Sequence, residues 1–251
     1  MACLFLSFAH PDDEAFLAGG TVSRYADAGV RIVLASAPRG DSGKTGDPPI
    51  CSVEQLPEVR ERELREAAAI LGIAAVHMLG YRDRDLAAAP PDRIREQLVG
   101  LIRSESPSVV LTFDPNGANL HPDHVAISRF TSDAVAAAAD PRWFPELGPP
   151  HAVQRLVWVA GRHPWEWARD DHPGARAGVD FLLDTSRWRE RKLAALLSHR
   201  TQIASVTRHF VRHADRERVL SSEFFRQAWG PRLLTRPVSD LFDGLGPETF
   251  G

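Results

Sequence analysis

The chain has 251 residues, of which 43% are hydrophobic and 25% charged, a composition typical of a globular domain that buries a full core. Its 30 basic and 33 acidic residues give a net charge of -3, which argues against nucleic acid as the main partner. Two cysteines do not make a disulfide framework, and no stretch approaches the roughly 18 uncharged apolar residues of a transmembrane helix. We therefore expect a cytoplasmic protein with no membrane span.

Short apolar runs alternate with amphipathic segments along the first 140 residues. The apolar runs predict buried parallel strands at 2–8, 31–37, 74–79 and 108–113. The amphipathic segments predict helices at 14–28, 57–72, 91–104 and 122–139. A long polar loop is expected at 39–56 and a turn at 80–83. This alternation predicts an α/β fold with a Rossmann-like, mostly parallel sheet flanked by helices.

The rest of the chain is less regular, and we expect it to complete the sheet and the site within one domain over 1–251. Strands are predicted at 152–160 and 179–184, and helices within 186–213. Between them, residues 143–178 are rich in Pro, Trp and His and are expected to wrap the site or an interface. Trp165 and Trp167 in this segment mark a candidate lid or homo-oligomer contact.

A histidine and three carboxylates follow the first predicted strand, in the run Ala-His-Pro-Asp-Asp-Glu at 9–14. Open α/β sheets bind ligands beyond the carboxyl ends of their strands, so His10 should face that crevice. His10 and Asp13 are three residues apart, so one helical turn can bring them together, while Asp12 stays free to act. The alternative is that the carboxylates only complement the helix N-terminus, which leaves His10 unexplained.

The run His-Pro-Asp-His at 121–124 follows another predicted strand. Imidazole and carboxylate groups suit zinc, and a catalytic zinc site keeps three protein ligands and one open position. His10, Asp13 and His124 satisfy that count.

His121 and Asp123 then remain outside the ligand set. A histidine held by an aspartate can become an imidazolium that stabilises a developing oxyanion. The alternative is a helix start with two solvent-facing histidines. That alternative loses weight because both clusters follow strands of one predicted sheet.

Together these residues resemble the PIG-L/LmbE-type deacetylases, zinc enzymes that remove acetyl groups from N-acetylglucosaminyl compounds. The family's A-H-P-D-D-E and H-P-D-H motifs stand complete in this chain. The chain also resembles the family's R-x-x-E-L-x-x-A-A-x-x-L-G helix at 60–72, its L-G-Y-x-D turn at 79–83 and its K-x-x-A-L-x-x-H-x-[ST]-Q stretch at 192–202. The likeness therefore spans most of the chain in order.

The resemblance implies a role for each residue of the two clusters. The three ligands named above would hold Zn²⁺, although iron(II) suits the same donors. Asp12 would be the general base. His121 would stabilise the oxyanion or act as the acid, with Asp123 orienting it.

Three further residues are expected to bind the substrate, a small-molecule amino-sugar conjugate. The resemblance implies that Arg60 binds near the metal and that Asp83 contacts sugar hydroxyls. Asn119 stands where some members carry a tyrosine as an added oxyanion donor. The expected reaction is metal-dependent hydrolysis of an N-acetyl group to acetate and a free amine.

Three alternatives remain beside that reading. One is a zinc amidase acting on a different acylated amine, and another is a non-catalytic metal- or sugar-binding protein on the same fold. The third, a nucleotide-binding Rossmann enzyme, is disfavoured because the loop after the first strand lacks G-x-G-x-x-G and carries acidic residues that repel a pyrophosphate.

Overall fold

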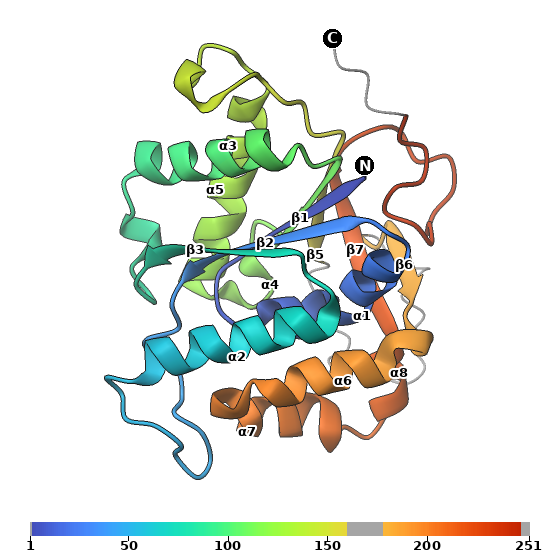
Figure 1. The fold of residues 1–251 in the computed structure, drawn as a ribbon. Helices are drawn as coiled ribbons and strands as arrows, with labels where there is room; N and C mark the ends of the chain where they lie inside the picture. Colours follow the sequence, from blue (N-terminus) through green and yellow to red (C-terminus); the bar gives the residue numbers. More distant parts are fainter. Residues whose placement is uncertain (1, 160–177, 247–251) are drawn as a thin grey trace.

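The computed structural model of the chain describes residues 2–159 and 178–246 (Figure 1). In this part of the chain, strands form one seven-stranded sheet. They are β1 (Cys3–Phe8), β2 (Arg31–Pro38), β3 (Ala75–Tyr81), β4 (Val109–Thr112), β5 (Arg155–Val159), β6 (Phe181–Asp184) and β7 (Ser222–Trp229). Their order is β3-β2-β1-β4-β5-β7-β6. Neighbours from β3 to β5 are parallel, whereas β7 runs antiparallel to β5 and β6.

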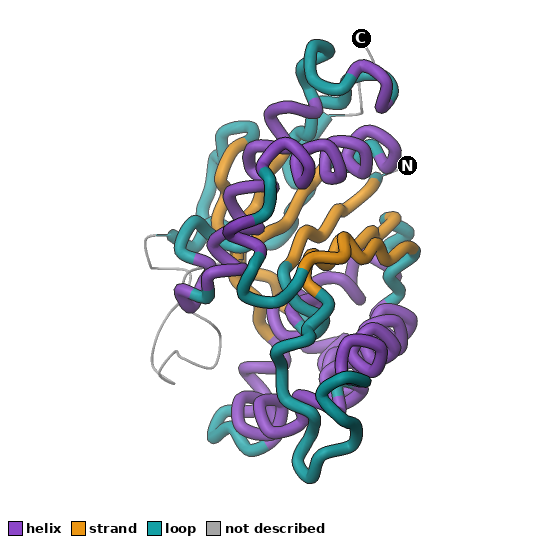
Figure 2. The backbone as a smooth tube through the Cα atoms, turned by 90° about the vertical axis from the view of Figure 1, so that its left-hand side faces the viewer, coloured by secondary structure: helices purple, strands orange, loops and turns teal. Residues whose placement is uncertain are grey.

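Helices cover both faces of the sheet. They are α1 (Asp13–Asp27), α2 (Leu56–Leu71), α3 (Pro91–Glu105), α4 (Gly117–Leu120), α5 (Pro122–Ala138), α6 (Arg189–Ser198), α7 (Ile203–Val206) and α8 (Arg216–Ser221). In Figure 1, α3 and α5 lie together on one side, and α1, α2 and α6 lie on the other. Figure 2, turned by 90°, shows the strands between helical layers above and below. None of the helices in the described ranges combines the length and apolar character needed to cross a bilayer.

The apolar runs become central strands because both faces of the sheet are covered. All six residues of β1 are buried, as a strand between two helical layers requires. The α2 helix turns Leu64, Ala67 and Leu71 into the core, and Gly72 ends it in the left-handed conformation, with its N–H donating to the Ala68 carbonyl. The predicted α/β fold with a mostly parallel sheet is therefore confirmed.

Several local expectations need correction. The predicted turn at 80–83 begins later, because β3 continues to Tyr81. The helical region expected at 186–213 is divided among α6, α7 and a π-helical turn at 207–211. Of the expected wrapping segment 143–178, residues 160–177 lie outside the described part of the chain, and so do Trp165 and Trp167.

The sequence analysis missed strand β7, which inserts between β5 and β6. Its second residue, Glu223, is a fully buried charge that interrupts an apolar pattern. The carboxylate of Glu223 accepts from Lys192 Nζ at 2.7 Å and from the backbone N–H groups of Gly20 and Thr21 at 2.9 and 2.7 Å. Partners so distant in sequence satisfy the charge, so pattern alone could not identify this strand.

The strand order fixes where a site can form. The chain places β2 and β3 on one side of β1, and then crosses to place β4 on the other side. Ligands of open α/β sheets bind at such a switch point, beyond the carboxyl ends of the strands. The segments that follow β1 and β4 carry His10 and His121, so this topology brings the two clusters together.

Candidate active site

A pocket lies beyond the carboxyl ends of β1 and β4. All of the residues predicted for the site line it except Asp123, which lies behind His10. Residues that the sequence analysis did not single out also line it, among them Ser42, Arg84 and His209. The pocket is therefore built by loops after several strands and by the C-terminal part of the chain.

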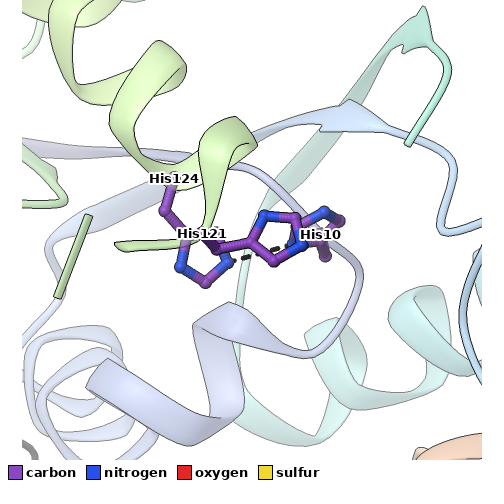
Figure 3. Close-up of side chains that lie close together, drawn as sticks. All are labelled: His10, His121 and His124. Carbon is purple, nitrogen blue, oxygen red and sulfur yellow. Dashed lines mark hydrogen bonds between the residues drawn. The ribbon is translucent and has the colours of Figure 1, made fainter. Parts of the chain in front are cut away.

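The imidazoles of the two clusters meet inside this pocket. His10 Nδ1 lies 3.1 Å from His124 Nε2, and Figure 3 shows these rings together with the ring of His121. The carboxylate of Asp13 lies 3.6 Å from His124 Nε2 and 3.8 Å from His10 Nδ1. Donors of a tetrahedral zinc site stand roughly 3.4 Å apart, so the two imidazole nitrogens have the spacing that a shared ion needs. Asp13 lies beside them with a different oxygen toward each, Oδ1 toward His124 and Oδ2 toward His10.

The far nitrogen of each of these two histidines has its own partner. His124 Nδ1 lies 3.1 Å from the Gly117 carbonyl, and His10 Nε2 lies 3.2 Å from Asp123 Oδ2. Such outer contacts fix the tautomer and aim the other ring nitrogen at a metal. Gly117 is needed here because its φ is +63° and an added Cβ would lie 2.7 Å from His124 Cβ.

Two groups of side chains in the described residues have donor atoms close enough for a metal ion, and both include His10. One is formed with His121 and His124, the other with Asp83 and Asp123. The second group is better explained without an ion, because both oxygens of each of its carboxylates accept backbone N–H groups, whereas on Asp13 Oδ2 accepts the His10 N–H and Oδ1 faces His124. The imidazole group, with Asp13 beside it, is therefore the part of the pocket that fits a metal.

Burial makes the carboxyl groups beside the histidines hard to ionise. It raises the pKa of Asp13 to about 8 in the protein without a cation, and it also raises the pKa of Asp12, although Arg60 counteracts it there. A divalent cation reverses this effect because it stabilises the charged carboxylate. The donor set and its electrostatics thus fit a metal at this position.

Asp12 is held in place by Arg60 from helix α2. Arg60 Nη2 donates to Asp12 Oδ2 at 3.0 Å and to the Pro11 carbonyl, and Nη1 donates to the Gly40 carbonyl at 3.2 Å. Asp12 has a φ of 133°, a conformation that L residues rarely adopt and that tends to mark functional positions. Arg60, which was expected to bind substrate, lines the pocket, and its hydrogen bonds in the structure position Asp12.

Glu14 and His199 form a second support for Asp12 that the sequence analysis did not identify. Glu14 Oε2 accepts from the Asp12 backbone N–H at 3.1 Å, and Oε1 lies 2.8 Å from His199 Nε2. Both side chains are almost fully buried. Burial alone would lower the pKa of His199, but the Glu14 carboxylate raises it above its ordinary value. The only feature of the sequence that could have pointed to this pair is that both residues belong to motifs of the resembled family.

His121 presents one ring nitrogen to the pocket as a donor. Burial and the nearby His10 lower its pKa, so the ring is neutral near pH 7. Its Nδ1 accepts from the Asp123 backbone N–H at 3.3 Å, which leaves the proton on Nε2. The carboxylate of Asp123 lies 4.0 Å from His121 and closer to His10, so its side chain orients His10 more directly than His121.

The remaining predicted residues, Asp83 and Asn119, differ in their exposure and in their hydrogen bonds. Asp83 is buried, and its two carboxylate oxygens accept the backbone N–H groups of Gly40 and Ser42 at 3.0 Å each. It therefore shapes the loop after β2. Asn119 is exposed, and its Oδ1 accepts from the His121 backbone N–H at 3.0 Å.

The chain is similar to known deacetylases in sequence and in fold. The profile of the PIG-L family, described as GlcNAc-PI de-N-acetylase, matches residues 5–135. A 1D-myo-inositol 2-acetamido-2-deoxy-alpha-D-glucopyranoside deacetylase of Streptomyces scabiei is 29% identical, over 98% of this chain and 91% of its own length. A probable N-acetyl-alpha-D-glucosaminyl L-malate deacetylase 2 of Bacillus anthracis is 30% identical, over 75% of this chain and 92% of its own length.

A solved structure extends the likeness to the fold. N,N'-diacetylchitobiose deacetylase from Pyrococcus horikoshii superposes with a TM-score of 0.70 over 90% of this chain and 83% of that protein, at 22% identity. At 22% identity, this comparison supports the fold of the chain and not its function. The family profile, in contrast, covers more than half of the chain, including both histidine clusters.

Proposed function

The chain belongs to the PIG-L family, and from this we propose that it is a metal-dependent N-deacetylase of an N-acetylglucosaminyl conjugate. It hydrolyses the acetamide to acetate and a free amine on the sugar. The observation that carries the proposal is the close approach of His10 and His124, with the carboxylates of Asp13 and Asp12 beside them in one pocket. The named activities of the relatives support the same reaction.

We assign the metal to the side chains of His10, Asp13 and His124. Zn²⁺ is the proposed ion, and iron(II) suits the same mixture of imidazole and carboxylate. When bound, the ion supplies Lewis acidity toward the amide oxygen and makes water more acidic. Metal analysis of the protein purified without added metal distinguishes the two ions.

The protein's own residues move the protons. Asp12 accepts a proton from water as the water oxygen bonds to the acetyl carbon. Arg60 and the Glu14 carboxylate hold Asp12 in the orientation this step requires. His121, with its proton on Nε2, donates a hydrogen bond to the oxygen that gains charge. Asp12 then gives the proton that it took from water to the nitrogen, the C–N bond breaks, and the nitrogen leaves as an amine.

The role of Asp12 as general base can be tested by a substitution that removes its charge and keeps its size. Asp12→Asn should keep the bound metal, because Asp12 is not one of the assigned ligands, and should lower kcat by about 10²–10⁴. Acetate release and metal content would be measured on the same sample. The exposed Asp85, which does not line the pocket, gives the matched control Asp85→Asn. Near-wild-type turnover by Asp12→Asn would remove Asp12 from the role of base.

A further inference from the structure

The charged side chains that line the pocket are, with one exception, engaged by other parts of the protein. Arg60 is bonded to Asp12 and two carbonyls, Asp13 contacts His10 and His124, and Asp83 accepts two backbone N–H groups. The exception is Arg84. Within the described ranges, no carboxylate lies within 4.0 Å of its guanidinium. Among the described residues that line the pocket, Arg84 is thus the one cation with unused hydrogen-bond donors.

The backbone holds Arg84 firmly at the mouth of the pocket. Its N–H donates to Asp123 Oδ2 at 2.6 Å, and the same oxygen lies 3.2 Å from His10 Nε2. One carboxylate therefore ties Arg84 to a proposed metal ligand. The φ of Arg84 is 68°, in the left-handed region where glycine or asparagine is the usual residue. Here the chain instead places a long cationic side chain, exposed and lining the pocket.

We propose that Arg84 determines substrate specificity by binding an anionic group, a carboxylate or a phosphate, on the part of the substrate beyond the N-acetylglucosaminyl ring. The guanidinium fork suits either oxyanion, because it offers two parallel N–H donors. A neutral polyol at that position would leave the charge unpaired. This inference rests on the proposed deacetylase function and goes beyond it by naming the chemical class of the conjugate.

The test compares three conjugates that differ in charge. N-acetylglucosaminyl malate carries carboxylates, N-acetylglucosamine 1-phosphate carries a phosphate, and N-acetylglucosaminyl inositol is neutral. Wild-type enzyme should show a higher kcat/KM for an anionic conjugate than for the neutral one. The anionic conjugate with the higher kcat/KM identifies whether Arg84 binds a carboxylate or a phosphate. Arg84→Gln should lower this ratio by about 10- to 100-fold, mainly through KM, since a hydrogen bond to a charged group is lost. Arg84→Lys keeps the charge and should retain part of the preference.

Arg82 supplies the matched control. It lies two residues away and is 81% exposed, with its guanidinium 3.7 Å from Asp41, and it does not line the pocket. Arg82→Gln should leave the ratio unchanged. A fall in activity that is equal for all three conjugates in Arg84→Gln would mean a structural role and would overturn the proposal. A wild-type preference for the neutral conjugate would overturn it as well.

Binding gives a second readout that does not depend on turnover. Calorimetry on the chelated proteins, which should not turn the conjugates over, should show tighter binding of N-acetylglucosaminyl malate or N-acetylglucosamine 1-phosphate to the wild type than to Arg84→Gln, with the difference shrinking as ionic strength rises. If no conjugate is deacetylated but this difference is present, the proposed function fails while the anion site stands. If deacetylation occurs and the difference is absent, only the anion site fails.

Discussion

Replacing Arg60 by methionine tests how the structure holds its proposed base. The side chain of Arg60 is only 4% exposed, and three acceptors depend on it: Asp12, Pro11 and Gly40. The two carbonyl bonds contribute about 1 kcal/mol each, and the bond to the carboxylate contributes about 1.5–3 kcal/mol. Since methionine fills much of the space, little is added for a cavity, and we expect Arg60→Met to lower the free energy of unfolding by about 3.5–5 kcal/mol.

Urea unfolding in the presence of a chelator measures this loss without a contribution from bound metal. The matched control is Arg65→Met, because Arg65 lies on the same helix but is 53% exposed and pairs with Glu61 at the surface. That change should cost less than about 1 kcal/mol. In a double-mutant cycle, Arg60→Met should cost about 1.5–3 kcal/mol less in the Asp12→Asn background. Equal costs for Arg60→Met and Arg65→Met, or no coupling to Asp12, would refute the reasoning.

Three further changes test other parts of the site. His124→Ala should reduce bound metal from about one equivalent to a small fraction, measured by elemental analysis; stoichiometric metal would contradict the ligand assignment. His199→Gln should lower the free energy of unfolding most below about pH 6.5. The Glu14 carboxylate raises the pKa of His199, so the stability gained from the charged ring is lost as pH rises through that higher pKa. Urea unfolding at several pH values should therefore show the wild-type advantage shrinking toward alkaline pH, and a growing advantage would reverse the argument. Gly40→Ala should cost about 1–3 kcal/mol in the same assay, because a Cβ there would lie 2.5 Å from Arg60 Nη1 and Gly40 has a φ of +78°; unchanged stability would show that the loop can move aside.

The meeting of the two clusters could be predicted because it follows from strand topology. His10 follows one buried strand and His121 another, and parallel strands on the two sides of a switch point direct their following loops to the same place. Local spacing then placed Asp13 near His10. This part of the site depends only on neighbours in sequence and on the order of the strands.

The supports of the site could not be predicted in the same way. Glu14 and His199 are 185 residues apart, and Arg60 reaches Asp12 from a different helix. The spacing of residues in the sequence does not indicate such pairs, since only the packing of the helices brings their side chains together. The contact between Asp123 and His10 was also not predicted, because His121 is closer to Asp123 in the sequence and is the partner that the sequence suggests.

The most direct test of the proposed function is acetate release from N-acetylglucosaminyl conjugates by chelated enzyme and by the same enzyme reloaded with Zn²⁺ or iron(II). Acetate should appear only after reloading, in amounts equal to the free amine formed. Release that is unaffected by complete removal of the metal would contradict the metal-dependent mechanism. The absence of release with one equivalent of metal bound would contradict the deacetylase assignment.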